Sequence, residues 1–178
     1  KTSTSIVNEP VELGRAKSFT PGWLENESVF MHMEYKYLLE LLRKGLPDKF
    51  FADIKTALVP FLDAATYGRS ILENSSFIAS SANPNPDIHG RGYVARLTGS
   101  TVEFLHMWLT MFVGKQPFVY DNEKQQLAFQ LQPTLPSWLF KEDGTVSFTL
   151  FSGIEVTYHN PTGSDTFGDN GVQPVSYK

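Results

Sequence analysis

The hydrophobic period changes once along the chain, at Gly114, and this change limits the folds that are possible. Before Gly114, apolar residues recur every three or four positions, as on one face of an α-helix. After it, apolar and polar or small residues alternate in 127–131, 146–150 and 154–158. Alternation with a period of two is typical of strands with one buried face. The sequence therefore predicts helices first and then an antiparallel β meander.

Three helices are expected before this boundary. Apolar spacing predicts helices over 27–45 and 48–62, with a Gly-Leu-Pro turn between them, and a third helix over 100–113. The third is apolar almost all round, so we expect it to be buried on most sides. Three such helices do not close a core, so we expect this part to pack against further helices outside the sequence.

The expected organisation has three parts: an irregular lead-in over 1–25, a helical segment over 26–116 and a β unit over 117–178. Residues 63–99 contain a long segment rich in Ser, Asn, Pro and Gly, which predicts a loop. Long ordered loops are usually functional.

Composition excludes several classes of function. The 178-residue chain has a net charge of −4, so it lacks the basic excess that general nucleic-acid binding needs. It has no cysteine, which excludes disulfides and thiolate metal sites, and its histidines show no metal-ligand spacing. We therefore expect no metal and no cofactor. The longest apolar run, 104–113, is about half of the ~20 residues that span a bilayer. We expect a cytoplasmic protein.

The segment Leu97–Thr101 directly precedes the third predicted helix. A helix N-terminus presents unpaired backbone N–H groups and the positive end of the helix dipole. Gly99 lets a ligand approach the backbone, and the Thr98 hydroxyl offers a further hydrogen bond, so the segment suits a phosphate group. The alternative is an ordinary N-cap, in which Ser100 or Thr101 caps the helix with help from Glu103.

Two further features could bind a ligand. Arg91 lies between two glycines and offers a planar fork for an anion or a pair of sugar hydroxyls, or else it is a solvated side chain in a tight turn. His32 lies on the first predicted helix, where a single histidine is usually a hydrogen-bonded core residue. No carboxylate is singled out by its spacing as a general acid.

Three segments, in order along the chain, resemble the cellobiose and chitobiose phosphorylase family of inverting glycoside phosphorylases. Trp23–His32 resembles its "ENGGIFxH" segment. His89–Gly90 followed by Leu97–Thr101 resembles its "HG…LTGT/S" segment, and Gln132–Pro136 resembles its "PxLP" segment. The order and approximate spacing agree over residues 20–160.

The resemblance implies a fold. It implies that the chain forms the terminal helices of an (α/α)6 barrel, followed by an antiparallel β-sandwich similar to a jelly roll. The family's general acid, an aspartate, lies upstream of this region, and no residue here matches it. The chain alone is therefore expected to be inactive, and the rest of the barrel is expected from a missing segment or a partner chain. The longer insert at 67–88 resembles the branches that act on β-1,2- or β-1,3-linked glucans.

The resemblance also implies a function. In inverting phosphorolysis, inorganic phosphate attacks the anomeric carbon of a β-gluco-oligosaccharide and releases α-glucose 1-phosphate. By position in the family's motifs, the residues implied to bind phosphate are His32, Thr98 and Gly99.

Three further residues are candidate sugar contacts that have no match in the cellobiose-type pattern: Arg69, Glu73 and Arg91. Two other functions stay open. The chain could be a non-catalytic carbohydrate-binding or structural module, or a segment of a six-hairpin glycoside hydrolase. A hydrolase needs a carboxylate base that holds water and does not need an anion site.

Overall fold

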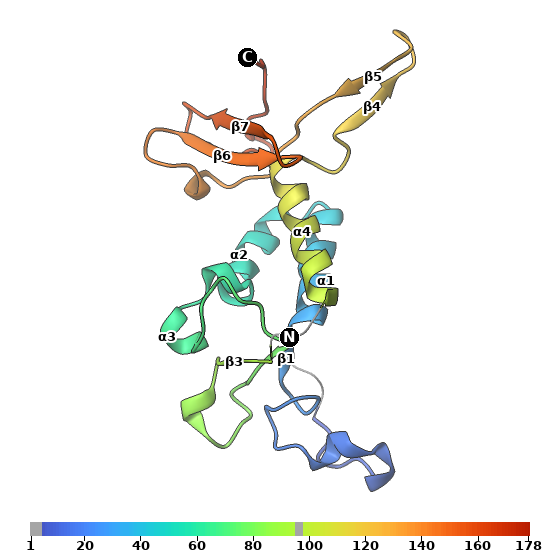
Figure 1. The fold of residues 1–178 in the computed structure, drawn as a ribbon, viewed down its shortest axis with the longest axis vertical. Coiled ribbons are helices and arrows are strands. Elements are labelled where there is room, and N and C mark those ends of the chain that lie inside the picture. Colours follow the sequence, from blue (N-terminus) through green and yellow to red (C-terminus); the bar gives the residue numbers. More distant parts are fainter. Residues whose placement is uncertain (1–4, 95–97) are drawn as a thin grey trace. The chain divides into compact units, whose positions relative to one another are not determined.

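The computed structural model describes residues 5–94 and 98–178, with the side chains of 98–100 excepted (Figure 1). It confirms the predicted mixture of helices and antiparallel sheets. The chain divides into two compact units, 1–106 and 107–178, with the division inside the last helix. Each unit is described by itself.

A small antiparallel sheet in the first unit organises the loop region. Strands β1 (Val29–Phe30), β2 (Phe77–Ile78) and β3 (Gly92–Tyr93) lie in the order β1-β2-β3. Phe30 pairs with Phe77, and Phe77 pairs with Tyr93. The prediction of a loop throughout 63–99 was therefore wrong for β2 and β3. Strands of two residues are too short to show an alternating pattern.

The first two helices begin or end inside the predicted ranges. Helix α1 (Met31–Arg43) starts four residues late because Val29 and Phe30 belong to β1. Helix α2 (Pro47–Ala57) stops before Pro60, whose missing N–H cannot continue the helix; a 3-10 turn follows instead. The two helices pack on one another through a shared set of buried side chains: Met31, Tyr35, Leu38, Leu39 and Leu42 from α1, and Phe50, Phe51 and Ile54 from α2.

Two more helices complete the helical part. The four-residue helix α3 (Ala64–Tyr67) is capped by the carboxylate of Asp63, which accepts from the N–H groups of Ala65 and Thr66. Helix α4 (Thr98–Phe112) follows β3. Single turns of 3-10 helix lie at Val11–Leu13, Arg15–Ser18, Val59–Phe61, Pro86–Ile88 and Ser137–Leu139.

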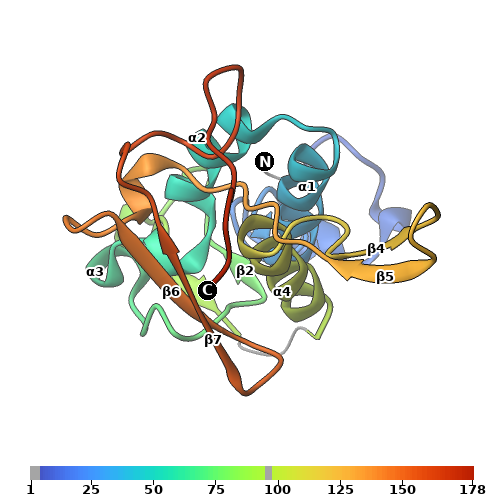
Figure 2. The same ribbon diagram turned by 90° about the horizontal axis from the view of Figure 1, so that it is seen from above.

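Helix α4 is less buried within this chain than its composition predicts. Val102, Leu105 and Leu109 are exposed, Leu105 by 61%. The predicted burial on most sides is thus not achieved by the described residues. On its covered side, Phe104 lies 5.9 Å from the ring of Tyr35 on α1. Figures 1 and 2 both show the start of α4 beside α1.

The second unit contains two separate hairpins, so the prediction of one continuous meander was wrong. The connection between them, 130–144, contains Pro133 and Pro136, which cannot donate to a strand ladder. Each hairpin is an antiparallel two-stranded sheet. The strands are β4 (Phe118–Asp121) with β5 (Gln126–Phe129), and β6 (Thr145–Leu150) with β7 (Ile154–His159).

The C-terminal segment, 161–178, has no helix or strand, but hydrogen bonds attach it to the connection between the hairpins. The Thr166 hydroxyl accepts from the N–H of Leu135 at 2.7 Å and donates to the carbonyl of Pro133 at 2.7 Å. The Leu131 N–H donates to the hydroxyl of Tyr177 at 3.2 Å. This segment therefore supplies partners that the proline-containing connection cannot find in a sheet.

Candidate functional site

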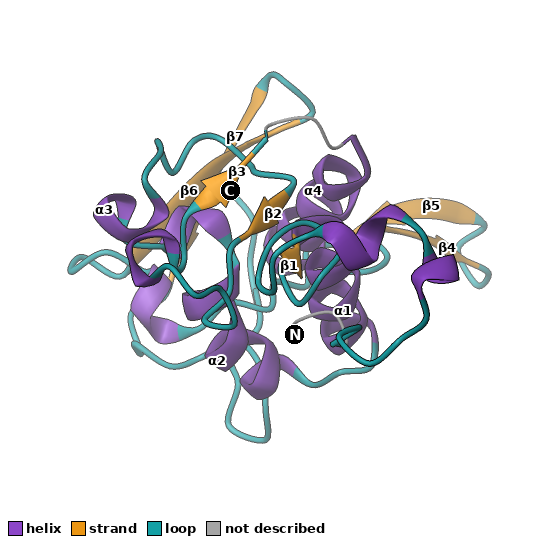
Figure 3. Cartoon of the chain, turned by 90° about the horizontal axis from the view of Figure 1, so that it is seen from below, coloured by secondary structure: helices purple, strands orange, loops and turns teal. Residues whose placement is uncertain are grey.

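The small sheet sets the directions of the segments that lead into two helices of the first unit. Strands β1 and β3 both run antiparallel to β2, so they point in the same direction. Strand β1 continues directly into α1, and α4 begins soon after β3. Figure 3 shows β1 and β2 side by side at the first turn of α1. The start of α1 and the end of β3 therefore lie at one edge of the sheet, and residues 95–97, which join β3 to α4, lie outside the described residues.

His32 is the second residue of α1, at this edge. Its ring meets the ring of Phe30 edge-on, with 5.6 Å between the ring centroids. Its Nδ1 atom is buried and has no hydrogen-bond partner among the described residues. Most buried polar atoms are hydrogen-bonded, and an exception requires an explanation. A ligand at the start of α1 is one such explanation.

Thr98 and Gly99 are the first two residues of the 15-residue helix α4. The first turn of an α-helix has N–H groups without partners inside the helix. The backbone N–H groups of Thr98 and Gly99 are therefore available at the start of α4, as the predicted phosphate segment requires. Ser100 and Thr101 lie inside the first turn of α4, so neither is the N-cap residue of the alternative; the side chains of 98–100 and all of Leu97 lie outside the described residues.

The loop predicted to contact sugar is held by glycines at close backbone approaches. A Cβ on Gly90 would lie 2.8 Å from the Thr66 methyl group. A Cβ on Gly68 would lie 3.6 Å from the aliphatic part of Arg91, so the Arg91 stem packs across Gly68. Gly68 also has a φ of 70°, which favours glycine, and it caps α3. The end of α3 therefore fits against the segment 89–92.

Tyr67, the last residue of α3, packs against the segment 89–92 at Gly92. A Cβ on Gly92 would overlap the Tyr67 ring and the Ser75 Oγ, so only glycine fits there. The Tyr67 hydroxyl donates to the carbonyl of Glu73 at 2.6 Å and lies 2.5 Å from Ser75 Oγ. Burial raises the pKa of Tyr67, and the hydrogen bond with Ser75 offsets part of that rise. Tyr67 therefore stays protonated and able to donate at neutral pH.

The three candidate sugar contacts lie around this same point. Arg69 forms an ion pair with Glu73, with 3.5 Å between Nε and Oε2. Arg91 is exposed and packs across Gly68. Gly68 is the residue directly before Arg69. Within the described residues, no carboxylate lies within 4.0 Å of the Arg91 guanidinium. The structure thus brings together residues that are up to 22 positions apart in the sequence.

A second tyrosine holds the same loop against α1. The Tyr35 hydroxyl donates to the side-chain oxygen of Asn74 at 2.9 Å. Burial raises the pKa of Tyr35 well above its ordinary value. The loop 68–76 is therefore fixed at Glu73, Asn74 and Ser75, on the C-terminal side of its exposed residues.

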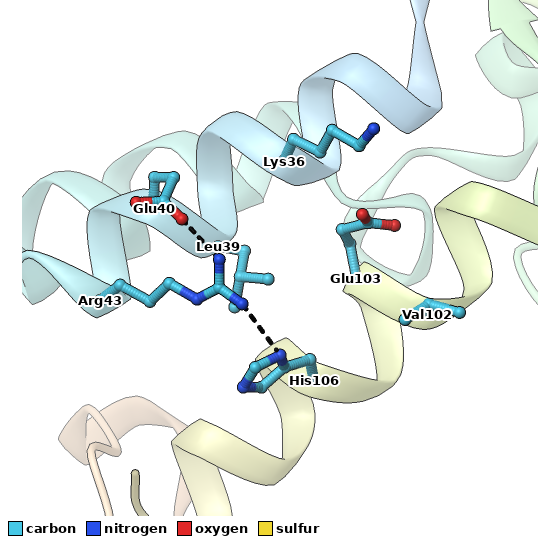
Figure 4. A pocket seen from close by; sticks show the side chains of 7 residues that line it. All are labelled: Lys36, Leu39, Glu40, Arg43, Val102, Glu103 and His106. Atoms are coloured by element: carbon cyan, nitrogen blue, oxygen red, sulfur yellow. Dashed lines mark hydrogen bonds and ion pairs between the residues drawn. The ribbon is translucent and has the colours of Figure 1, made fainter.

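Sequence reasoning missed a groove between α1 and the start of α4, of about 340 Å³ (Figure 4). Arg43 lies at its centre: its Nη1 donates to Glu40 at 2.6 Å, and its Nη2 lies 3.3 Å from Nδ1 of His106. Because a guanidinium only donates, Nδ1 of His106 accepts. Only the fold places the two side chains together, since they are 63 residues apart. The lining residues are Lys36, Leu39, Glu40, Arg43, Val102, Glu103 and His106.

None of the sequence-predicted site residues lines this groove. Across residues 5–94 and 98–178, no group of three metal-ligating side chains is close enough to hold a metal ion. Nor is any helix in those residues both long enough and apolar enough to cross a bilayer. Searches of protein-family models and of curated proteins found no match to this chain.

Proposed function

We propose that this chain is the phosphate-binding part of an inverting glycoside phosphorylase that acts on β-linked gluco-oligosaccharides. The observation that carries the proposal is the buried Nδ1 of His32, which lies in the first turn of α1 and has no partner within the described residues. His32, Thr98 and Gly99 are proposed to hold phosphate there.

This arrangement suits the chemistry of phosphorolysis. Phosphate must be held against the anomeric carbon with part of its charge neutralised, while one oxygen stays nucleophilic. Fixed backbone N–H groups at the start of α4 and an imidazole donor on α1 can do this with little reorganisation. One phosphate oxygen attacks the anomeric carbon opposite the leaving oxygen, which a carboxylic acid protonates, and the configuration inverts once. No residue of this chain is proposed as that acid.

We also propose a specific architecture for the helices and hairpins. We infer that α1, α2 and α4 are terminal helices of an (α/α)6 barrel, and that the two hairpins belong to a β-sandwich. Exposed Val102 and Leu105 on α4 are in keeping with further helices, which a missing segment or a partner chain would supply. The general acid would come from that part.

The test is a titration of the purified chain with inorganic phosphate, followed by NMR of the imidazole nitrogens. We expect the His32 signals to shift. Replacing His32 with Gln should weaken phosphate binding about tenfold or more, because a charge-assisted hydrogen bond is lost. Thr98→Val should weaken it as well. The matched control is His159→Gln, on an exposed strand position of the second unit, which should change nothing.

Unchanged phosphate affinity in both His32→Gln and Thr98→Val would contradict the proposal. Binding of gluco-oligosaccharides without any effect of phosphate would favour the alternative of a carbohydrate-binding module. Native mass spectrometry measures the mass of the assembly and shows whether a heavier partner chain is bound. If one is present, the complex should release α-glucose 1-phosphate from β-glucan oligosaccharides. Release of glucose alone would favour a hydrolase.

A further inference from the structure

Two short segments of the first unit interlock, and each provides a glycine where the other presents a larger side chain. Gly68 accepts the stem of Arg91, while Gly92 accepts the ring of Tyr67. Gly90 in turn lies over the methyl group of Thr66. Complementary contacts of this kind fix the position of Arg91 relative to the loop that begins at Gly68.

Tyr67 is the residue through which both segments are connected. It is 1% exposed, and its ring fills the space beside Gly92. Its hydroxyl donates to the backbone carbonyl of Glu73 at 2.6 Å. The backbone of Glu73 is thereby held, and with it the carboxylate that pairs with Arg69. Tyr67 itself is buried and cannot touch a ligand from solvent.

The solvent-facing groups around this point suit vicinal hydroxyls better than an anion. Arg91 presents a planar fork that can donate two parallel hydrogen bonds. The carboxylate of Glu73, beside Arg69, can accept from a hydroxyl. A pyranose ring offers both donors for the Glu73 carboxylate and acceptors for the Arg91 guanidinium, whereas an anion could use Arg91 alone because Glu73 already pairs with Arg69. The mixture of donors and acceptors therefore favours a polyhydroxyl ligand.

We infer that Tyr67 is a positioning residue for a sugar-binding surface formed by Arg69, Glu73 and Arg91, and that this surface takes the gluco-oligosaccharide. The inference rests on the proposed function for the identity of the ligand. It assigns Tyr67 a role in sugar affinity that is separate from phosphate affinity, since its hydroxyl bonds to the carbonyl of Glu73 and its ring lies at Gly92, next to Arg91.

The experiment is isothermal titration of the purified chain with the β-1,2- and β-1,3-linked glucose trisaccharides, each tested separately, and with inorganic phosphate. Tyr67→Phe keeps the ring against Gly92 and removes only the hydroxyl. We expect it to weaken binding of the preferred trisaccharide about five- to tenfold and to leave phosphate affinity unchanged. The matched control is Tyr158→Phe, which removes a partly buried tyrosine hydrogen bond of the same length from the second unit and should change neither affinity.

Equal loss of both affinities in Tyr67→Phe would mean general destabilisation and would overturn the inference, as would an unchanged trisaccharide affinity. If the wild-type chain binds phosphate but neither trisaccharide, this inference is overturned and the proposed phosphate site is not. A wild-type chain that binds neither ligand would overturn the proposed function first. If Tyr67→Phe does not fold, hydrogen exchange of the wild type decides: amides in 69–76 should exchange more slowly with trisaccharide and not with phosphate, and unchanged exchange would reject the surface.

Discussion

The two hairpins of the second unit have the same pairing pattern, but their apolar faces have different environments. In β6–β7, Phe148, Val156 and Tyr158 lie on one face and pack against a small core formed by Val113, Leu131 and Leu150. In β4–β5, one face is also apolar and includes two directly opposed pairs, but every member is exposed: Phe118 with Phe129, and Tyr120 with Leu127.

This difference between the two apolar faces shows what the alternation of apolar and polar residues can predict. Period-two alternation identifies the apolar face of a strand, because side chains point to opposite sides in turn. It does not identify what covers that face. An isolated two-stranded hairpin is at most marginally stable in water. Among the described residues, hairpin β6–β7 is stabilised by a buried core, whereas the apolar face of β4–β5 has the stacked contact of Phe118 with Phe151 and stays exposed.

The largest expected effect compares one leucine from each hairpin. Leu150 is 5% exposed and Leu127 is 65% exposed. Leu150→Ala should lower the free energy of unfolding of the second unit by about 2–4 kcal/mol, since it leaves a cavity in the small core. Leu127→Ala should change it by less than about 0.5 kcal/mol. Urea unfolding followed by circular dichroism measures both. Equal losses would show that the hairpins do not differ.

The next effect concerns the tyrosine of each hairpin. The Tyr158 hydroxyl donates to the carbonyl of Phe112 at 2.6 Å, at the end of α4, whereas Tyr120 is 56% exposed. Tyr158→Phe should cost about 1–2 kcal/mol, because it leaves a carbonyl without that donor. Tyr120→Phe should be close to neutral. The same unfolding measurement distinguishes them, and a neutral Tyr158→Phe would argue against the contact between β7 and the end of α4.

The stability of β6–β7 should also depend on alkaline pH, through Tyr158. Burial raises the pKa of Tyr158 above its ordinary value of 10.0. Above that pH the unfolded chain loses this proton and the folded chain keeps it, so stability must fall as the pH rises. Burial also raises the pKa of Tyr35 and Tyr67 in the first unit, so the ultraviolet absorbance of tyrosinate should show their late ionisation and, in addition, one late-ionising group from the second unit. Tyr158→Phe should remove that group, and an unaltered titration curve would refute the assignment.

Much of the fold follows from the sequence, and the errors have local causes. The period predicted α1, α2, α4 and all strands of β6–β7, because each is long enough to repeat its pattern. The strands β1, β2 and β3 are two residues each, and their stability comes from partners up to 49 residues away in the chain, as between Val29 and Ile78. No local pattern can report such pairing.

The candidate site was partly predictable for the same reason. Local chemistry predicted an anion site at Leu97–Thr101, and the resemblance implied His32 for the same site; both roles stay predictions. The contact between Tyr67 and Gly92 and the groove at Arg43 and His106 depend on how distant segments meet. The alternating glycines at 90 and 92 were the available signal, since closely packed backbone often requires glycine.

The smallest expected effect concerns one aspartate at a turn of each hairpin. Asp143, just before β6, accepts hydrogen bonds from the backbone and hydroxyl of Thr145, and these hold the pKa of Asp143 below its ordinary value of 3.8. Its contribution is therefore present above that pH and is lost as the pH falls through the lower folded value.

Replacing Asp143 with Ala should lower the unfolding midpoint of the second unit slightly at neutral pH, and this difference from the wild type should shrink in acid. Asp121, in the turn of β4–β5, accepts from the N–H groups of Glu123 and Lys124 at 3.0 and 3.1 Å. Because that hairpin has an exposed apolar face, Asp121→Ala should loosen the hairpin without moving the midpoint. A midpoint that moves equally in the two variants at neutral pH would mean that β4–β5 unfolds together with the core, and that the exposed hairpin is as much a part of the cooperative unit as the covered one.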